Sequence, residues 1–510
     1  MNFARLAEVS AAVAATQSRL EKRRLLAAAL REAEEDEIDL VATYLSGRVR
    51  QRRTGVGWRS LADLPAPAEQ ATLTPTDVDA QLESVAALAG TGSQAGRAAA
   101  VAALFGALTG PEQLFLRGLI LGEVRQGALD SLLIEAIAEA AEVPVGTVRR
   151  AAMFSALTGP VARAALTGGA AALEGFRPAV LEPVRPMLAS PAPDLAGALD
   201  KLRDDPATEV AADGKVDGIR VQVHKAGEEV AVFTRSLDDI TERVPEIAEV
   251  VRALPAEELI LDGEAIALDP SGRPRPFQET AARTGSHDAA GSTTPLTVYF
   301  FDLLHRDGQT LITAPAAERL AALEEVVPAS SLVPRRVTAD HAELDAFFHE
   351  ILELGHEGLV LKDLTAPYDA GRRGAAWVKV KPRHTLDLVV LGVEWGSGRR
   401  QGKLSNIHLG ARDDDGFVML GKTFKGMTDE VLAWQTERFL ELETHRDGHV
   451  VYVRPEQVVE IAFDGVQRSP RYPGGVALRF ARVLRYREDK TAAEADTLDA
   501  VRALAAPNKP

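Results

Sequence analysis

The pattern of apolar residues changes once along this chain of 510 residues, and that change limits the fold more than any other feature. Residues 1 to about 180 are rich in alanine and leucine, and their apolar positions recur every ~3.6 residues, as in amphipathic helices. A proline-rich stretch at 181–194 is typical of a linker. Beyond it, short runs of β-branched and aromatic residues predict strands. The sequence therefore predicts a multidomain α+β protein whose first domain is all-α.

Within the first 180 residues, helical spacing is clearest at 19–37, 112–125 and 129–142. Two segments resemble each other, Leu-Phe-Gly-Ala-Leu-Thr-Gly-Pro at 104–111 and Met-Phe-Ser-Ala-Leu-Thr-Gly-Pro at 153–160. Each is predicted to be a helix that ends at glycine, with proline beyond it. Duplication of a helical half-domain and chance similarity in an alanine-rich region both explain the repeat.

The rest of the chain is predicted to form sheets with a few helices. Residues 220–225 and 230–235 are the arms of a predicted hairpin. Further strands are predicted at 259–261, 296–301, 358–361 and 377–380, and helices at 244–254, 316–327 and 342–354. From 386 to 484 the pattern is mostly strands, with one helix at 429–442, which favours a small β-barrel.

Composition excludes several classes of protein. The chain has no cysteine, which rules out disulfides, Cys-ligated zinc and iron–sulfur clusters and suits a reducing cytoplasm. No apolar stretch reaches the ~18 residues that a membrane span needs, and the N-terminus is predicted to be an amphipathic helix. The net charge of −16 argues against nonspecific attraction to nucleic acid. Residues 372–425 and 479–490 are nevertheless locally basic, so a polyanion is expected to meet the C-terminal third.

Lysine is scarce, and one lysine lies in a distinctive setting. Only 12 of the 58 basic residues are lysines, and none occurs between Lys22 and Lys201. Lys215 lies in the run Asp-Gly-Lys-Val-Asp-Gly-Ile-Arg at 213–220. An amine can lose its proton and attack, whereas a guanidinium stays charged. The pattern Lys-x-Asp-Gly-x-Arg favours a lysine that attacks a nucleotide α-phosphate, although a charged β-turn is possible.

Other residues in this region could bind a nucleotide and a metal. Leu-Asp-Gly-Glu at 261–264 is predicted to place a carboxylate on a turn after an apolar strand. Glu357 lies directly before an apolar strand, and Lys379 and Lys381 share one face of another, because alternate strand residues point the same way. Alone, each carboxylate is an ordinary turn or strand residue, and Phe301 is by default a core residue.

Taken together, these motifs resemble the ATP-dependent DNA ligases of the covalent nucleotidyltransferase superfamily, in their three-domain form. The resemblance covers nearly the whole chain. It implies that Lys215 is the nucleophile that carries AMP, and that Mg²⁺ is held by Glu264 and Glu357. It implies nucleotide-binding roles for Asp213, Arg220, Arg235, Glu264, Phe301, Arg373, Lys379 and Lys381. Glu264 aligns with the family's glutamate that binds the ribose, and Phe301 with the aromatic residue that stacks on adenine. Arg235 aligns with the family's arginine that binds the phosphate at the nick.

The C-terminal run from Leu478 to Lys490 resembles the family motif that orients the pyrophosphate. Its residues expected to contact pyrophosphate or DNA are Arg482, Arg485, Arg487, Asp489 and Lys490, together with Arg235. The sequence departs from many relatives at Asp213, where they carry glutamate that helps to read the adenine amino group. The aspartate is one methylene shorter, so the departure bears on base selection and not on the class of reaction.

The resemblance also implies a domain plan and a partner. A helical DNA-binding domain is expected at 1–180, an adenylation domain at 185–383, an OB-fold at 384–492 and a tail at 493–510. The expected partner is nicked double-stranded DNA, bound by a monomer in the bacterial cytoplasm during replication, repair or recombination, without a membrane. Arg48, Arg50, Arg52 and Arg53 form a basic cluster suited to DNA phosphates, unless they are a solvated loop.

Four other functions are alternatives at this point. An RNA ligase or an mRNA capping guanylyltransferase would use the same lysine chemistry, although the long helical region and the Arg-Glu-Asp-Lys ending at 487–490 favour DNA ligase. An NAD-dependent ligase usually carries a tetracysteine zinc site, which a chain without cysteine cannot build. A catalytically dead nick-binding protein would lack the nucleophile or a metal ligand, and both are present.

Overall fold

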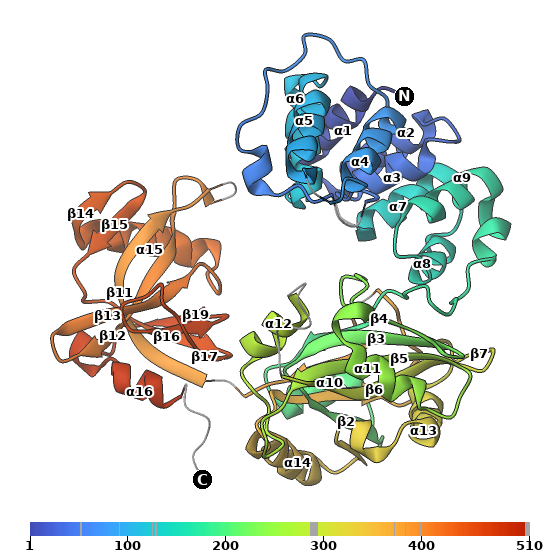
Figure 1. The fold of residues 1–510 in the computed structure, drawn as a ribbon. Helices are drawn as coiled ribbons and strands as arrows, with labels where there is room; N and C mark the ends of the chain where they lie inside the picture. The colour runs from blue at the N-terminus through green and yellow to red at the C-terminus, as the bar shows by residue number, and fades with distance from the viewer. Residues whose placement is uncertain are drawn as a thin grey trace. The chain divides into compact units, whose positions relative to one another are not determined.

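The protein is described here by a computed structural model that places residues 1–51, 54–90, 92–124, 126–127, 130–285, 294–371, 373–382, 384–397 and 400–504. The chain forms two compact units. Figure 1 labels their helices and strands. The first unit comprises Met1–Ala189, Asp217–Val333 and Leu364–Gly374. The second comprises Ser190–Val216, Pro334–Asp363 and the chain from Ala375 onward. Among these placed residues, no helix is both long and apolar enough to cross a membrane.

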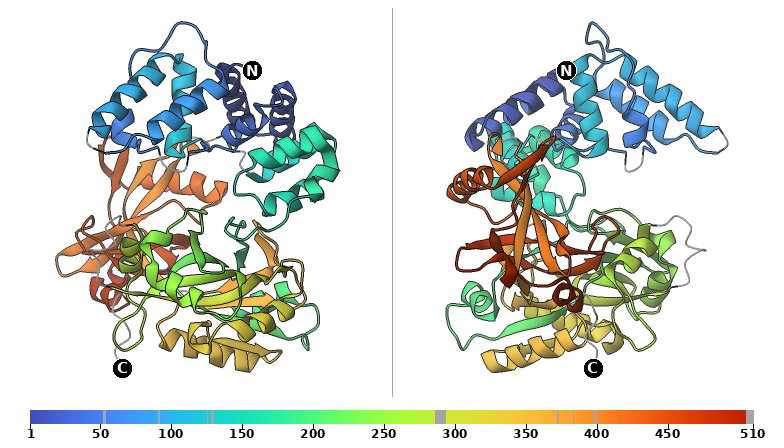
Figure 2. Two further views of the ribbon diagram at one scale, coloured as in Figure 1. Left: turned by 45° about the vertical axis from the view of Figure 1, so that its right-hand side comes forward. Right: turned by 90° about the vertical axis from the view of Figure 1, so that its left-hand side faces the viewer.

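The N-terminal part of the first unit is helical, as predicted, and both views in Figure 2 show its blue-to-teal helices. Buried Phe3, Leu26, Tyr44, Phe105 and Ile137 belong to its core. The helices are α1 (Phe3–Ala15), α2 (Arg19–Glu32), α3 (Ile38–Leu45), α4 (Pro75–Ala86), α5 (Ser93–Gly106), α6 (Gly110–Leu121), α7 (Asp130–Ala141), α8 (Val145–Met153) and α9 (Gly159–Glu174).

A helix ends inside each repeated segment, α5 at Gly106 and α8 at Met153, but the Gly-Pro pair of each segment begins the next helix, so the prediction that this pair ends a helix is wrong. Gly110 is the first residue of α6 and Gly159 the first of α9, with proline in the first turn of each. Proline suits this position because the first turn needs no N–H donor and fits the fixed φ of the ring. Thr109 and Glu112 form a capping box at the start of α6, and this box was the local signal for a helix start.

The first unit also contains an antiparallel sheet in the order β4-β3-β5-β6-β7. These strands are β3 (Ile219–Ala226), β4 (Glu229–Thr234), β5 (Glu258–Ala267), β6 (Leu296–Arg306) and β7 (Gln309–Thr310). Helices α11 (Pro245–Arg252), α12 (Phe277–Gly285) and α13 (Ala316–Val326) contact it. The predicted hairpin at 220–235 is confirmed as β3 and β4. Glu264 lies inside β5, opposite Arg220 of β3, so the prediction that it lies on a turn is wrong.

A second sheet, in the order β1-β10-β9-β2-β8, lies largely in the second unit. Its strands are β1 (Leu188–Pro191), β2 (Val210–Lys215), β8 (Arg335–Thr338), β9 (Gly358–Asp363) and β10 (Arg373–Val380). Helices α10 (Leu195–Leu202) and α14 (His341–Glu353) cover it through Leu195, Leu344 and Ile351. The proline-rich stretch that was predicted to be a linker contains β1. Lys215 is the last residue of β2 and pairs with Gly358 of β9.

The segment Leu364–Gly374, which we call the strap, connects β9 to β10 but belongs to the first unit. Backbone hydrogen bonds hold it there: Ala316 N donates to Ala366 O, Tyr368 N to Ile312 O and Gly371 N to Pro186 O. The strap therefore leaves one sheet, packs within the other unit and returns.

The C-terminal part is strand-rich, as predicted, and forms a half-barrel shown in orange and red in Figure 2. Its sheet follows the order β13-β12-β11-β15-β14, with β16 pairing with β11 and β19. The elements are β11 (His384–Trp395), β12 (Leu404–Asp413), β13 (Gly416–Thr423), α15 (Asp429–Glu441), β14 (Glu443–Asp447), β15 (Val450–Val453), β16 (Val458–Phe463), β17 (Gly465–Arg468), β18 (Val476–Arg479), β19 (Arg482–Arg487) and α16 (Leu498–Ala503). The predicted helix at 429–442 is confirmed as α15.

Candidate active site

Lys215 meets a carboxylate and a second lysine at one end of the second sheet. Glu357 lies just before β9 and forms an ion pair with Lys215. Lys381 lies just after β10, and its Nζ is 3.0 Å from Glu357 Oε1 and 2.9 Å from Oε2. The backbone supports this arrangement, because Glu357 N donates to Lys215 O over 2.8 Å. The structure thus brings together three residues that are far apart in the sequence.

Gly358 lets β9 approach β10 closely at this point. Its φ is +140°, and an added Cβ would lie 2.2 Å from Val380 O. A side chain there would force the strands apart and move Glu357 relative to Lys381. The glycine in the Glu-Gly pair is therefore required by the packing of the site.

The three charged side chains are largely shielded from water. Lys215, Glu357 and Lys381 expose 22%, 14% and 21% of their side chains. Lys381 also lies 3.5 Å from Asp464 Oδ2, just beyond β16. Lys379 is half-buried on β10, opposite Val360 of β9. Attack on a phosphate needs such a setting, since the amine must lose its proton and the cations must offset phosphate charge.

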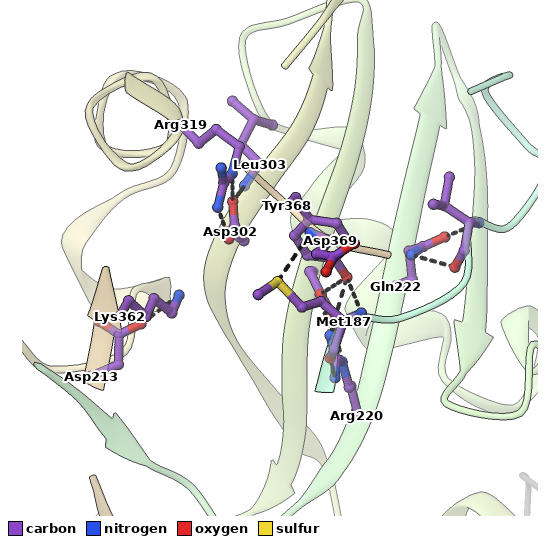
Figure 3. Close-up of polar contacts among 12 residues, drawn as sticks. Met187, Asp213, Arg220, Gln222, Asp302, Leu303, Arg319, Lys362, Tyr368 and Asp369 are labelled. Carbon is purple, nitrogen blue, oxygen red and sulfur yellow. Dashed lines mark hydrogen bonds and ion pairs between the residues drawn. The ribbon is translucent and has the colours of Figure 1, made fainter. Parts of the chain in front are cut away.

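Asp213, two residues before Lys215 on β2, is buried in a network of its own. Its carboxylate lies 2.8 Å from Lys362 Nζ and accepts hydrogen bonds from Arg335 over 2.6 and 3.1 Å. Burial acts to raise the pKa of Asp213, but the charges of Lys362 and Arg335 outweigh it and hold this pKa below its ordinary value. Figure 3 shows the Asp213–Lys362 pair. The carboxylate that was expected to read adenine is thus occupied by two cations.

In the first unit, Arg220 is held in a fixed orientation beside Phe301. Its guanidinium donates to both oxygens of Asp262, over 2.9 and 2.6 Å, and also to Met187 O and the Tyr368 hydroxyl (Figure 3). Its Cζ lies 5.5 Å from the centre of the Phe301 ring. Burial acts to lower the pKa of Arg220, and the charge of Asp262 reverses this and raises it. Arg220 is therefore a permanent cation at this site.

Glu264 and Gly218 meet where β3 enters this sheet. An added Cβ on Gly218 would lie 2.3 Å from Ala265 O and 2.9 Å from Glu264 Cγ. The glycine of Lys-x-Asp-Gly is thus fixed by close contact with β5. Glu264 and Phe301 are half-buried on neighbouring strands of the same sheet.

Arg235 lines a different feature, a cavity of about 510 Å³ in the first unit. Arg48, Arg149 and Arg185 also line it, with Asp130 as the carboxylate among them. Asp130 Oδ2 lies 3.4 Å from Arg185 and 3.8 Å from Arg48. Burial lowers the pKa of Arg185, Asp130 opposes that shift and Arg48 adds to it. An excess of arginines around a cavity favours binding of an anion.

The C-terminal candidate residues lie on β19 and the turn after it. Arg485 Nε donates to Glu460 over 2.7 Å, and Arg487 bridges Asp387 and Asp489. Lys490 Nζ lies 2.6 Å from Asp387. Arg482 pairs through its backbone with Ala462 of β16. The side chain of Arg373, and Arg52 and Arg53, lie outside the described residues.

The donor atoms suit Mg²⁺ bound with substrate. Within the described part of the chain, no three His, Asp or Glu side chains group as a complete metal site. Mg²⁺ seldom needs one, because it is commonly held by one or two carboxylates together with water and phosphate oxygens. Glu357 in the second unit and Glu264 in the first are both half-buried carboxylates, so each by itself could supply one such oxygen ligand.

Sequence reasoning missed four of the residues that organise the site: Asp262, Arg335, Lys362 and Tyr368. Lysine scarcity was a usable signal for Lys362, which is 1% exposed and pairs with Asp213. Arg335 and Tyr368 act through contacts between distant segments, and no local pattern predicts such contacts.

The Asp213 network leads to a prediction about stability. Replacing Asp213 with alanine leaves Lys362 and Arg335 without their carboxylate, and breaking a buried ion pair in this way costs about 3–5 kcal/mol. We therefore expect Asp213→Ala to lower the free energy of unfolding by that amount in urea denaturation. Glu228→Ala, at a side chain 93% exposed, is the control and should change stability by less than ~0.5 kcal/mol. Unchanged stability in Asp213→Ala, with lost discrimination between ATP and GTP, would instead support the base-reading role.

Comparison with known proteins agrees with this geometry. Residues 186–381 match the family model described as ATP dependent DNA ligase domain, and residues 400–490 match ATP dependent DNA ligase C terminal region. A protein named "Probable DNA ligase" from Beutenbergia cavernae is 62% identical, with 99% of this chain and 100% of the relative covered. One from Kineococcus radiotolerans is 58% identical over 99% of this chain and 100% of its own.

A solved structure shares the fold. "Pmar-Lig_PreS3" aligns with a TM-score of 0.62 and 18% identity, covering 94% of this chain and 99% of its own. The likeness supports the fold described above, with a helical N-terminal region, central sheets and a strand-rich C-terminal region. On the family matches and the identity to these relatives, the chain belongs to the ATP-dependent DNA ligase family.

Proposed function

We propose that this DNA ligase seals nicks between a 5′-phosphate and a 3′-hydroxyl in duplex DNA, through lysyl-AMP and adenylylated DNA. The observation that carries the proposal is the convergence of Lys215 and Lys381 on Glu357. This arrangement supplies a nucleophilic amine, a carboxylate and a phosphate-binding cation in one place. The family membership supports ATP as the nucleotide.

In the first step, Lys215 Nζ attacks the α-phosphorus of ATP. A P–N bond forms, the bond from the α-phosphorus to the bridging oxygen breaks, and pyrophosphate leaves. Glu357 contacts the Lys215 ammonium and is placed to accept the proton that Nζ must lose. Lys381, which follows the end of β10, and Lys379 of β10 offset the growing negative charge on the phosphate oxygens.

Residues of the first unit bind the rest of the nucleotide. Phe301 stacks on the adenine, Glu264 binds the ribose, and Arg220 adds a fixed positive charge beside the ring. On the C-terminal region, Arg482, Arg485, Arg487, Asp489 and Lys490 orient the pyrophosphate. Mg²⁺ held by Glu357 and Glu264 would supply further charge neutralisation on the phosphates.

The next two steps pass AMP to the DNA and then release it. An oxygen of the 5′-phosphate at the nick attacks the adenylyl phosphorus, and the P–N bond to Lys215 breaks. The 3′-hydroxyl then attacks the activated 5′-phosphate and expels AMP. Arg235 and the other arginines that line its cavity bind backbone phosphates of the nicked duplex. The enzyme acts as a monomer in the cytoplasm.

The nucleophile assignment is tested by Lys215→Arg. A guanidinium keeps the charge and reach of lysine but is not deprotonated, so no AMP adduct should form. The measurement is transfer of label from α-labelled ATP to protein on a denaturing gel. Labelled GTP and NAD, run beside ATP, separate a DNA ligase from a guanylyltransferase or an NAD-dependent enzyme. Lys201→Arg is the control, because Lys201 is exposed and its Nζ donates only at the surface to Pro191 O. This variant should form the labelled AMP adduct as wild type does. Covalent AMP on Lys215→Arg would refute the assignment.

The role of Glu357 is tested by Glu357→Gln. The amide keeps the size of the side chain but loses the charge that pairs with both lysines and binds Mg²⁺, so adenylylation should fall at least ~100-fold. The rate of adduct formation is measured across a range of Mg²⁺ concentrations. Glu353→Gln, on the exposed end of α14, should behave like wild type. Near-normal activity of the Glu357 variant would show that the residue is only structural.

The arginine-lined cavity is tested by Arg149→Gln and Arg235→Gln. Each removes one cation, so each should weaken binding to nicked DNA and reduce the slope of log K against log salt by ~0.9. Self-adenylylation should be unaffected by Arg149→Gln. Arg150→Gln is the matched control, because Arg150 is the next residue on α8 and packs over Phe154. An unchanged salt slope in both cavity variants would show that the cavity is not a phosphate site.

A further inference from the structure

Tyr368 of the strap is buried at the centre of the hydrogen bonds around Arg220. It is 1% exposed, and its hydroxyl donates to Asp262 Oδ2 over 2.7 Å. The hydroxyl oxygen of Tyr368 also accepts hydrogen bonds from Met187 N over 3.0 Å and from Arg220 Nη2 over 3.2 Å. A phenol has one donor and two acceptor sites, so these three contacts use its whole capacity (Figure 3).

Asp262 links this tyrosine to Arg220. Its side chain is 1% exposed, and Oδ2 accepts from both Tyr368 and Arg220 Nη2, while Oδ1 accepts from Arg220 Nε. The paired bonds through Nε and Nη2 hold the guanidinium close to the plane of the carboxylate, because both N–H donors must point at the two oxygens at once. The hydroxyl of Tyr368 in turn fixes the carboxylate.

The ring of Tyr368 is held from its other side. The Arg319 guanidinium lies 5.8 Å from the ring centre and is itself completely buried. Arg319 donates to Asp302 over 2.8 and 3.1 Å, and also to the carbonyls of Ala314 and Ala366. Ala366 belongs to the strap, so Arg319 anchors both the ring and the backbone that carries it. The position of the hydroxyl therefore follows from the packing of the strap.

We propose that Tyr368 is a positioning residue for nucleotide transfer: through Asp262 it sets the direction in which Arg220 presents its charge beside Phe301. This inference rests on the proposed nucleotide-binding role of Arg220. The hydroxyl of Tyr368 contacts Asp262 and Arg220 directly, so Tyr368 acts on the guanidinium through these two bonds. Burial and the charge of Asp262 raise the pKa of Tyr368 well above its usual value, so the hydroxyl remains a donor at any working pH.

The first test is Tyr368→Phe, which keeps the ring against Arg319 and removes only the hydroxyl. The rate of lysyl-AMP formation by the folded enzyme at saturating ATP should fall about 10-fold. Tyr44→Phe is the matched control, because Tyr44 is a fully buried tyrosine in the helical core of the first unit. It should adenylylate at the wild-type rate. A wild-type rate for Tyr368→Phe would overturn the proposal.

A double-mutant cycle separates positioning from a general effect on the fold. In an Arg220→Lys background the forked contact is already lost, so adding Tyr368→Phe should reduce the rate less than about 2-fold further. A merely structural role predicts that the full loss persists in that background, and this result would also overturn the proposal.

Asp262→Asn is a second, independent test of the proposal if Tyr368→Phe does not fold. The amide keeps the size of the carboxylate but cannot accept on both atoms, so it should show a loss similar to that of Arg220→Lys. A wild-type rate for this variant counts against the proposal. If wild-type protein itself forms no lysyl-AMP, the proposed function fails instead, and the two failures are thereby distinguished.

Discussion

The site depends on one electrostatic constraint, which is that two ammonium groups are held close together at the end of a sheet. Lys215 and Lys381 would repel each other if no anion lay between them, and Glu357 meets both. Strands β2, β9 and β10 are neighbours in the sheet, and this order brings the three residues together. Gly358 permits the close approach of the last two strands. An incoming polyphosphate would add the negative charge that this cluster is built to receive.

Charges buried elsewhere in the two central sheets follow the same rule. Asp213 is paired with Lys362 and Arg335, Asp262 with Arg220, and Asp302 with Arg319. Such pairs add little net stability, since desolvation offsets much of their attraction, but removing one partner is costly. Their value here is geometric, because each fixes the direction of a side chain next to a candidate site residue.

Sequence reasoning predicted many of the strands, and it proposed the site residues that local patterns mark. Alternation placed Lys379 and Lys381, and lysine scarcity drew attention to Lys215. It failed at Glu264, because a strand that continues through Asp-Gly-Glu looks locally like a turn, and at the Thr-Gly-Pro segments, because glycine and proline occur at both ends of helices. It could not find Tyr368 or Arg335, since their partners are set by contacts between distant segments. The domain boundaries and the residue roles remain predictions.

The strap has a consequence for how the protein is made. The order of segments along the chain alternates between the two units, so neither unit is a continuous stretch of sequence. During synthesis, β2 with Lys215 emerges long before β9 and β10, and its sheet can close only when all of them are available. Pairing over such separations is slow to form. The nascent chain therefore holds an incomplete sheet until β10, which follows the strap, has been made, and Lys215 gains its partner Glu357 only shortly before that.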